Sequence, residues 1–475
     1  MKKIIIAIVA VILLGLFLST FIEANDIHSE DNGKNIVISV EKINNNLNNN
    51  FELSKDDENI ICATCRGLVK LNSSNEVVLD LAKDLDVSQD GIEYKFTLND
   101  DIYWSNGEKI KADQVVEYFK SLIQNEENKD SKLLSAIYGV DKFRQEKVDF
   151  EKYVAITSEE DTVKIRLNKK DDNFLYELSK PQYSVRRNLY LWGDIKNNYD
   201  RIIYSGEYSI SDVQEEYIEL KNNYNTQGKN IIMIKDENKE NSMASYEIGD
   251  RDVVIDVPIS QVSRLDSNKR ILSSSSGEGI YIAINSEKMN LDMRKQFIKI
   301  LYRASQEYYD KNQKAVRFSE GSYFENEMDE LDKLQRRKVN INNSNECEIP
   351  SKINIFIGKD DVSEDFVRFL AQYFKEKYEV NIEYSEDEKQ GEFHMALLRL
   401  KNDSNKKNQL FDEMQKVFNK QNNAYFLDGS RSEENIFNSC IVLPVLFVNR
   451  NIAISDNVGD IKINGNGNLD LSDID

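Results

Sequence analysis

Residues 66–120 decide the fold and read RGLVKLNSSNEVVLDLAKDLDVSQDGIEYKFTLNDDIYWSNGEKIKADQVVEYFK. From 92 to 98, apolar and polar residues alternate with the two-residue period of a half-buried strand. The dipeptide Asp-Gly at 90–91 is a turn signal, so we expect a hairpin with residues 85–87. Apolar residues then recur at helical spacing over 115–123. The stretch therefore predicts two strands, a turn and a helix, in that order.

The same pieces resemble the N-terminal signature of the family-5 extracellular solute-binding proteins. That family reads close to G-L-V, then L-A-x-S-W-x-V-S-x-D-G-x-x-Y-x-F-x-L, W-S-D-G and T-A-x-D-V. Here the corresponding pieces are GLV at 67–69, LAKDLDVSQDGIEYKFTL at 81–98 and WSNG at 104–107. Lys111 replaces the usual Thr at the helix entry, which removes an N-cap oxygen. The family comprises the oligopeptide, dipeptide and nickel receptors of ABC importers, and the resemblance extends over about residues 35–471.

Length and charge set the outer bounds of the function. The chain has 475 residues, too many for one compact core, so we expect two or three lobes. It carries 83 acidic and 62 basic residues and a net charge of −21. Such a charge disfavours nucleic acid or an anionic membrane as a partner of the folded body.

The resemblance implies an α/β (α+β) fold of the type II periplasmic-binding-protein kind. It implies two hinged lobes with an extra inserted α+β domain, and a far lobe that is shortened here. The strand at 279–285 and the run at 441–448 are expected to form the two crossing segments of the hinge. The expected lobes are a base lobe of residues 35–55, 182–280 and 445–475, an inserted lobe of residues 56–181, and a far lobe of residues 281–444.

The N-terminus is predicted to be a targeting segment. Lys2 and Lys3 precede an apolar run over 4–18. As a helix this run would be about 22 Å long, and about 28 Å if it continued to Ile22, against about 30 Å for a bilayer core. Residues 1–24 are therefore either a cleaved signal peptide or an uncleaved membrane anchor, followed by a polar linker at 25–34. Both alternatives place the body outside the cytoplasm.

The cysteines and histidines offer little chemistry. The first cysteine is Cys62, so the sequence does not predict a lipoprotein. Cys62 and Cys65 have the spacing of a redox or metal pair, but without a second such pair or a nearby histidine we prefer buried structural residues. His28 and His394 are the two histidines, and no catalytic or phosphate-binding motif is present. We expect no catalysis, no cofactor and no metal, and two histidines also argue against nickel.

Candidate ligand-binding residues follow from the register of the resemblance. A peptide receptor needs an acid for the ligand's ammonium group and aromatic-lined pockets for its side chains. Asp403 stands at the register of that acid, and the alternative is a loop carboxylate before a lysine-rich segment. The remaining candidates are Tyr281, Asn285, Tyr138 and Tyr183, and each tyrosine could instead be a packed aromatic residue.

The leading hypothesis is a monomeric solute-binding protein that closes its lobes over a short peptide, or a related small solute, and delivers it to an ABC permease. A second is a degenerate family member that acts as a membrane-tethered sensor or interaction protein without transport. A hydrolase that uses His394 is a third.

Between the first strand and residue 50, a run of asparagines from position 44 replaces the family's Leu-Asp-Pro turn and predicts a solvated loop.

Overall fold

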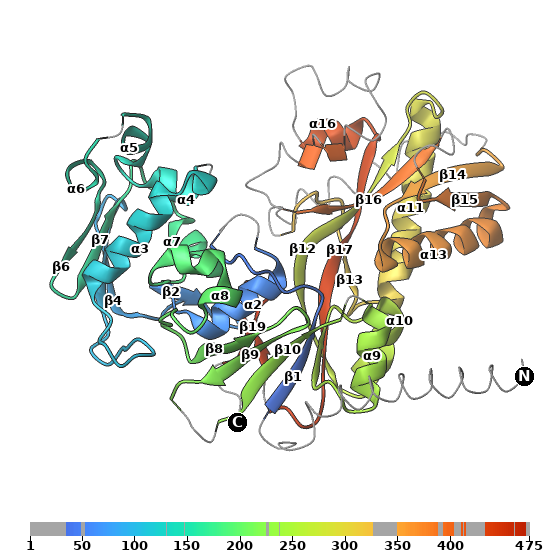
Figure 1. Cartoon of the computed structure of the whole chain (residues 1–475). Coiled ribbons are helices and arrows are strands. Elements are labelled where there is room, and N and C mark those ends of the chain that lie inside the picture. The colour runs from blue at the N-terminus through green and yellow to red at the C-terminus, as the bar shows by residue number, and fades with distance from the viewer. Residues whose placement is uncertain are drawn as a thin grey trace, which may run out of the picture. The chain divides into compact units, whose positions relative to one another are not determined.

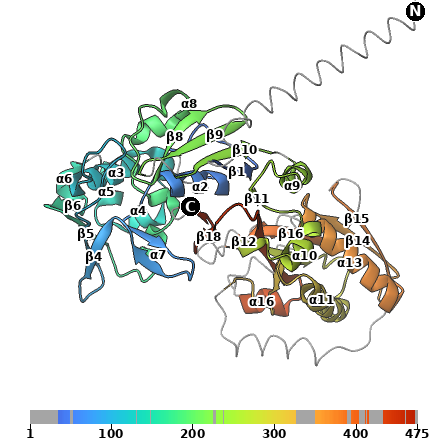
Figure 2. The same ribbon diagram turned by 90° about the horizontal axis from the view of Figure 1, so that it is seen from below.

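The computed structural model describes residues 35–471 except 49–52, 130, 147, 225–227, 237, 326–348, 388–392, 403–409, 412, 415–432 and 460. The chain forms two compact units (Figures 1 and 2). The first unit contains the chain up to Val253 and again from Ser455, and the second unit contains Val254–Ile454. The chain therefore passes between the units twice. The three-lobe boundaries expected from the resemblance stay a prediction.

The stretch at 66–120 folds as its pattern predicts. Strand β5 (Glu93–Leu98) pairs antiparallel with β4 (Ala82–Val87), so that Phe96 lies opposite Leu85. Gly91 adopts a left-handed φ of 71° in the turn between them, which glycine tolerates. Tyr94, Phe96 and Leu98 are buried, whereas the alternate residues 93 and 95 are exposed. The predicted hairpin is confirmed.

Helix α3 (Ala112–Gln124) follows and packs on the same sheet (Figure 1). Its apolar face is buried and includes Val115, Phe119 and Leu122. Lys111 offers no capping oxygen, but the reciprocal half of a capping box is present, because Gln114 Oε1 accepts from the Lys111 N–H at 3.0 Å. The side chain of a residue in the first turn therefore satisfies one backbone donor at the start of the helix.

The four-stranded antiparallel sheet of this region has the order β4-β5-β7-β6. The helical turns around it fill its edges and extend the apolar core. These elements are β6 (Ile156–Glu159), β7 (Thr162–Arg166), the 3-10 turn Glu126–Asn128, α4 (Lys132–Ala136), α5 (Val140–Glu146), α6 (Phe150–Tyr153) and α7 (Phe174–Leu178).

The rest of the first unit is built on a second sheet. Strand β1 (Asn35–Val40) is parallel to β10 (Asn230–Lys235), which continues antiparallel to β9 (Tyr217–Asn222) and β8 (Tyr208–Val213). Around it lie α2 (Lys55–Thr64), the hairpin β2 (Val69–Leu71) and β3 (Val77–Leu79), 3-10 helices η2 (Pro181–Tyr183) and η3 (Leu189–Gly193), α8 (Ile195–Asn198), α9 (Lys239–Glu247) and the terminal hairpin β18 (Lys462–Ile463) and β19 (Leu469–Asp470).

The loop after β1 is held in place more firmly than the predicted solvated loop. The buried Asp56 carboxylate accepts the backbone N–H groups of Glu41 and Lys42 at 3.0 and 3.1 Å. Asp57 accepts the Asn44 side chain at 2.6 Å, and Leu47 is fully buried. The predicted loop is solvated at Asn45 and Asn46, which are exposed. It is nevertheless anchored, because carboxylates in the first turn of α2 satisfy polar groups that water would otherwise bind.

The second unit contains two long antiparallel strands, β12 (Ile271–Ile284) and β17 (Val442–Ile454). The predicted crossing segments at 279–285 and 441–448 form parts of these strands but lie inside the second unit, whereas the chain passes between the units at 253–254 and 454–455. Beside β12 runs β16 (Met395–Lys401), followed in the sheet by β14 (Lys352–Ile357) and β15 (Asn381–Ser385); β13 (Val316–Phe318) pairs with β17.

Helices cover this sheet and complete the second unit (Figure 1). Because β14 and β15 are parallel, a crossover must connect them, and α13 (Asp361–Tyr378) supplies it in a βαβ unit. The other helices are α10 (Ile259–Ser267), α11 (Leu291–Lys311) and α16 (Glu433–Asn438), and the short strand β11 (Val253–Ile255) stands where the chain enters the unit.

No helix in the described part of the chain is long and apolar enough to cross a membrane. The predicted targeting segment at 1–24 lies outside the described residues.

Candidate functional site

Tyr281, a predicted ligand residue, lies on β12 and is fully buried in the second unit. Its hydroxyl donates to the Tyr323 carbonyl oxygen at 2.7 Å and accepts from Asn402 Nδ2 at 2.7 Å. The rings of Tyr281 and Tyr323 stack with their centroids 6.4 Å apart. In this structure Tyr281 packs in the core, and its contact with a ligand stays a prediction.

Asn285, directly after β12, holds the turn that follows the strand. Its Nδ2 donates to the Phe393 carbonyl oxygen at 3.2 Å, and its Oδ1 accepts from the Glu287 N–H at 3.0 Å. Asp403, the predicted partner of a ligand ammonium group, lies outside the described residues. Both assignments to ligand binding therefore stay predictions.

The two remaining predicted residues belong to the first unit and have contrasting surroundings. Tyr183 is buried, its hydroxyl lies 3.0 Å from Ser131 Oγ, and burial raises its pKa to about 12. Tyr138 is 51% exposed, and the Arg166 guanidinium lies 5.3 Å from its ring centroid. Of these two tyrosines, Tyr138 alone offers its ring to solvent.

The cysteines and the described histidine have structural surroundings. Burial, as the largest cause, raises the pKa of both Cys62 and Cys65 to about 12, so both thiols stay protonated at neutral pH. A protonated thiol is a poor nucleophile and a poor metal ligand. His394 Nδ1 accepts the Asn354 N–H at 3.1 Å, so this ring nitrogen is engaged in a structural hydrogen bond. Among the described residues, no cluster of three or more possible metal ligands occurs.

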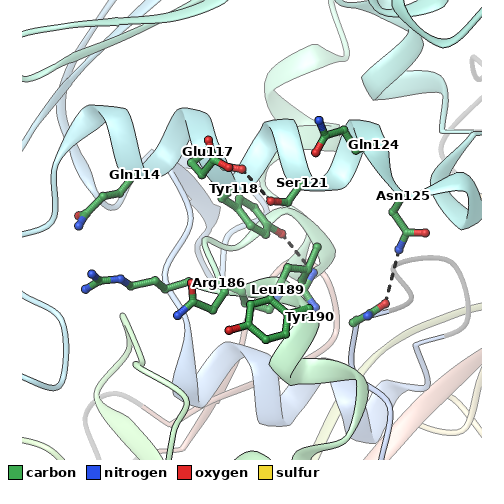
Figure 3. A pocket seen from close by; sticks show the side chains of 12 residues that line it. Gln114, Glu117, Tyr118, Ser121, Gln124, Asn125, Arg186, Leu189 and Tyr190 are labelled. Carbon is green, nitrogen blue, oxygen red and sulfur yellow. Dashed lines mark hydrogen bonds between the residues drawn. The ribbon is translucent and has the colours of Figure 1, made fainter. Parts of the chain in front are cut away.

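A cavity of about 480 Å³ opens in the first unit beside α3, and we call it the α3 cavity (Figure 3). Helix α3 forms one wall, the segment that leads into η3 forms the other, and Asn48 lies at one end. The cavity is lined by Asn48, Gln114, Glu117, Tyr118, Ser121, Gln124, Asn125, Arg186, Arg187, Asn188, Leu189 and Tyr190.

The wall on α3 is a polar stripe. Its members recur at positions 114, 117, 118, 121, 124 and 125, which is the spacing of one helix face. Gln114 is oriented by its neighbours, because its Oε1 accepts from the indole Nε1 of the buried Trp104 at 2.8 Å. At the other end of the stripe, Asn125 Nδ2 lies 3.5 Å from Asn48 Oδ1 (Figure 3). The helix thus presents amide and hydroxyl groups along the length of the cavity.

The opposite wall is braced by Arg186, of which only 1% is exposed. Its guanidinium donates to the Leu47 carbonyl oxygen, to the Gln182 carbonyl oxygen at 2.9 Å and to the Tyr118 hydroxyl at 3.1 Å. Each of these bonds involves a charged donor, and such bonds are stronger than neutral ones. Arg186 therefore connects η2 and the loop after β1 to α3, which forms the other wall.

The rim contains an ion pair and an exposed ring. Arg187 pairs with Glu108, and this hydrogen bond lowers the pKa of the Glu108 carboxyl. Asn188 adopts a left-handed conformation with φ 52°, which asparagine tolerates better than most residues, and begins the turn into η3. Tyr190 follows it and is 70% exposed.

None of these lining residues is among the predicted site residues. The sequence does carry a partial signal, since polar residues recur on one face of the helix predicted around 115–123. By itself that pattern is typical of a solvated helix face. Only the packing of residues 186–190 beside α3 turns the face into a cavity.

Sequence comparison places residues 76–303 in a known family. They match the model of the bacterial extracellular solute-binding proteins, family 5 Middle. The dipeptide-binding protein of Lactococcus lactis subsp. cremoris (strain MG1363) is 32% identical over 119 residues, which make up 25% of this chain and 22% of that protein. The matched region thus spans about a fifth of that relative's length.

Structural comparison covers nearly the whole chain. The periplasmic oligopeptide-binding protein OppAIV from Borrelia burgdorferi superposes with a TM-score of 0.59 at 15% identity, covering 90% of this chain and 96% of that one. NikA from Staphylococcus aureus, solved in complex with Ni(L-His)2, gives 0.56 at 16% identity, covering 92% and 98%. The predicted type II periplasmic-binding-protein fold is confirmed.

Proteins of this family bind peptides or small solutes outside the cytoplasm and work with ABC permeases. The family match begins within the stretch at 66–120 whose spacing first indicated the fold, and it continues into α11. By this match, residues 76–303 of the chain belong to the bacterial extracellular solute-binding proteins of family 5.

Proposed function

We propose that this protein captures a short peptide, or a related small solute, outside the cytoplasm and delivers it to an ABC permease. The observation that supports this most is the family match over residues 76–303. The relative with 32% identity is a dipeptide-binding protein, which favours peptides within the family's range of solutes.

We further propose that capture occurs by closure of the two units over the solute. The chain forms two compact bodies and passes between them twice, at 253–254 and at 454–455. Two rigid bodies joined by short crossings can close by changes in a few backbone dihedral angles. Closure would exclude water and strengthen polar contacts to the bound solute.

A peptide suits the chain better than nickel does. Imidazole is a preferred ligand of nickel, and the whole sequence contains two histidines. One of them, His394, uses its Nδ1 to accept a backbone hydrogen bond. A peptide instead requires hydrogen-bonding groups and a carboxylate, and for the latter we retain Asp403 as the candidate.

Calorimetric titration with di- to pentapeptides tests the proposal. We expect binding by at least one length class, and Asp403→Asn should weaken it about tenfold for peptides with a free amino terminus. The affinity for N-acetylated peptides should change little on the same substitution, because these peptides have no free ammonium group. Asp172→Asn, which changes an exposed carboxylate in the first unit, is the matched control. The proposal would be refuted if no peptide gave a heat of binding and native mass spectrometry detected no peptide bound to the purified protein.

The N-terminal segment is assigned a targeting role in the same proposal, as a signal peptide or as an anchor. Intact-mass measurement of the protein from culture medium and from membranes distinguishes the two. A mature form that starts near residue 25 in the medium would favour cleavage. A membrane form that retains Met1 would favour an anchor, and a cytoplasmic form would contradict both.

A further inference from the structure

We propose that the α3 cavity binds a neutral, polyhydroxylated ligand of the size of a mono- or disaccharide. This site is separate from the proposed peptide capture and does not depend on it. The cavity is formed wholly by residues of the first unit, so it exists without any contribution from the second. Its volume of about 480 Å³ lies within the usual range of small-molecule sites, about 300–1,000 Å³.

The lining chemistry matches hydroxyl groups. Most lining side chains are uncharged amides and hydroxyls, namely Asn48, Gln114, Gln124, Asn125, Asn188, Ser121 and Tyr190. The Tyr118 hydroxyl also lines the cavity, but it already donates to Gln182 and accepts from Arg186. An amide offers two donors and an acceptor, and a hydroxyl offers one donor and two lone pairs. A sugar presents neighbouring hydroxyls that each donate and accept, so its pattern of groups is the complement of this lining.

One donor is fixed in advance. Gln114 Oε1 accepts from Trp104 Nε1 at 2.8 Å and from the Lys111 N–H at 3.0 Å. Both partners are obligate donors, so the amide orientation is set and Nε2 is the group left to donate to a ligand. A group ordered before binding loses less conformational freedom when the ligand arrives.

The two guanidinium groups of the cavity already have hydrogen-bond partners within the protein. Arg187 is paired with Glu108, and Arg186 donates to three protein oxygens. Glu117 adds a carboxylate on α3, at the opposite wall. The Glu117 carboxylate would repel a free anion, and the two guanidinium groups would repel a cation. The electrostatics therefore favour a ligand without net charge.

An aromatic ring completes the site. Tyr190 is 70% exposed beside the cavity, and the buried Leu189 lies next to it (Figure 3). The C–H face of a sugar ring is slightly positive and packs against the negative face of an aromatic ring. An extended peptide would need several apolar pockets for its side chains, whereas Leu189 is the single aliphatic residue among those lining this cavity.

The test titrates the full-length protein with glucose, N-acetylglucosamine, maltose and cellobiose, using saturation-transfer NMR and calorimetry. We expect at least one of these sugars to bind, with its ring protons saturated by aromatic protons of the protein. Tyr190→Ala should weaken that binding at least about tenfold, whereas Tyr190→Phe, which keeps the ring, should change it less than about threefold. Tyr224→Ala removes a 60% exposed tyrosine elsewhere in the first unit and should leave it unchanged.

Three outcomes would overturn the proposal. The first is the absence of binding by all four sugars at about 10 mM to a protein whose circular dichroism shows a folded chain. The second is equal binding by wild type and Tyr190→Ala. The third is binding of inorganic phosphate alone, or of an amine whose affinity is lost in Glu117→Gln. A parallel peptide titration keeps the two proposals apart, because Tyr190→Ala should leave peptide affinity unchanged.

Discussion

The sheet under α3 in the first unit and the strand pair β12–β16 in the second are both buried, but by different means. Under α3, apolar side chains such as Phe96 and Phe119 fill the interior. Beside β12 and the end of β16, the buried Tyr281 and the half-buried Asn402 bond to each other and to Tyr323. An apolar core tolerates many arrangements, whereas a bonded polar cluster is satisfied in few of them.

The largest expected effect tests the apolar region. Phe96→Ala should lower the free energy of unfolding by about 3–5 kcal/mol, because the fully buried ring leaves a cavity. Urea-induced unfolding measures the change. Lys95→Ala, on the exposed face of the same strand, should change the free energy of unfolding by less than about 0.5 kcal/mol. Similar losses for both substitutions would contradict the burial of this strand.

The next effect concerns a partly buried ion-pair cluster of the second unit. The Arg399 guanidinium donates to Glu278 at 2.7 Å and to Asp360 at 3.3 Å, and Asp360 also caps α13. Arg399→Met should cost about 2–3 kcal/mol of unfolding free energy, below the about 3–5 kcal/mol of a fully buried pair, because water still reaches the cluster.

The matched control for Arg399 is Arg368→Met, which removes an exposed pair with Glu364 within α13. Exposed pairs contribute about 0–1 kcal/mol, so the two substitutions should differ clearly in urea-induced unfolding. If both substitutions lowered the unfolding free energy by the same small amount, the partly buried ion pairs of Arg399 would contribute no more to stability than the exposed pair of Arg368.

A smaller effect is expected at Tyr281. Tyr281→Phe deletes one hydroxyl that donates to Tyr323 and accepts from Asn402, and should cost about 1–2 kcal/mol of unfolding free energy. Tyr384→Phe, an exposed tyrosine of β15, should cost less than about 0.5 kcal/mol. A stabilised Tyr281→Phe protein would show that the buried hydroxyl is retained for another reason, such as contact with a ligand.

The smallest effect is electrostatic and returns to the first unit, at the surface beside α3. A hydrogen bond from Lys120, as the largest cause, lowers the pKa of Glu151 from 4.5 to about 2. A lowered pKa in the folded state means that the pair stabilises the fold above pH 4.5 and that this contribution is lost as the pH falls from 4.5 to about 2.

Glu151→Gln should therefore lower the unfolding midpoint slightly at pH 7 and leave it unchanged at pH 2. Because Glu151 is exposed, about 1 M salt should also abolish the difference. Glu117→Gln, whose carboxylate lies 4.0 Å from the same lysine, is the control and should show a weaker pH dependence. A difference that persists at pH 2 would rule out charge pairing as its cause.

Local pattern accounts for the parts of the fold that the sequence predicts well. The alternation over 92–98 and the helical spacing over 115–123 each need only neighbouring residues, and both are confirmed. For the loop after β1, the asparagines indicate solvent exposure, but the carboxylates that anchor the loop belong to α2 and are not part of that local pattern. The composition of a segment can predict a loop, but it does not reveal which residues elsewhere in the chain will hydrogen-bond to that loop.

What the sequence determined by itself is the order of elements around residue 91, which follows from short-range periodicity and turn chemistry. The class of the fold and the family it resembles came from the ordered motifs of the same stretch. The tertiary structure alone decided that Tyr281 is buried in a bonded cluster and that residues 186–190 meet α3 to form a cavity. Both depend on contacts between residues more than 40 positions apart, such as the 42 between Tyr281 and Tyr323 and the 68 between Tyr118 and Arg186. No local pattern in the chain encodes such a distance.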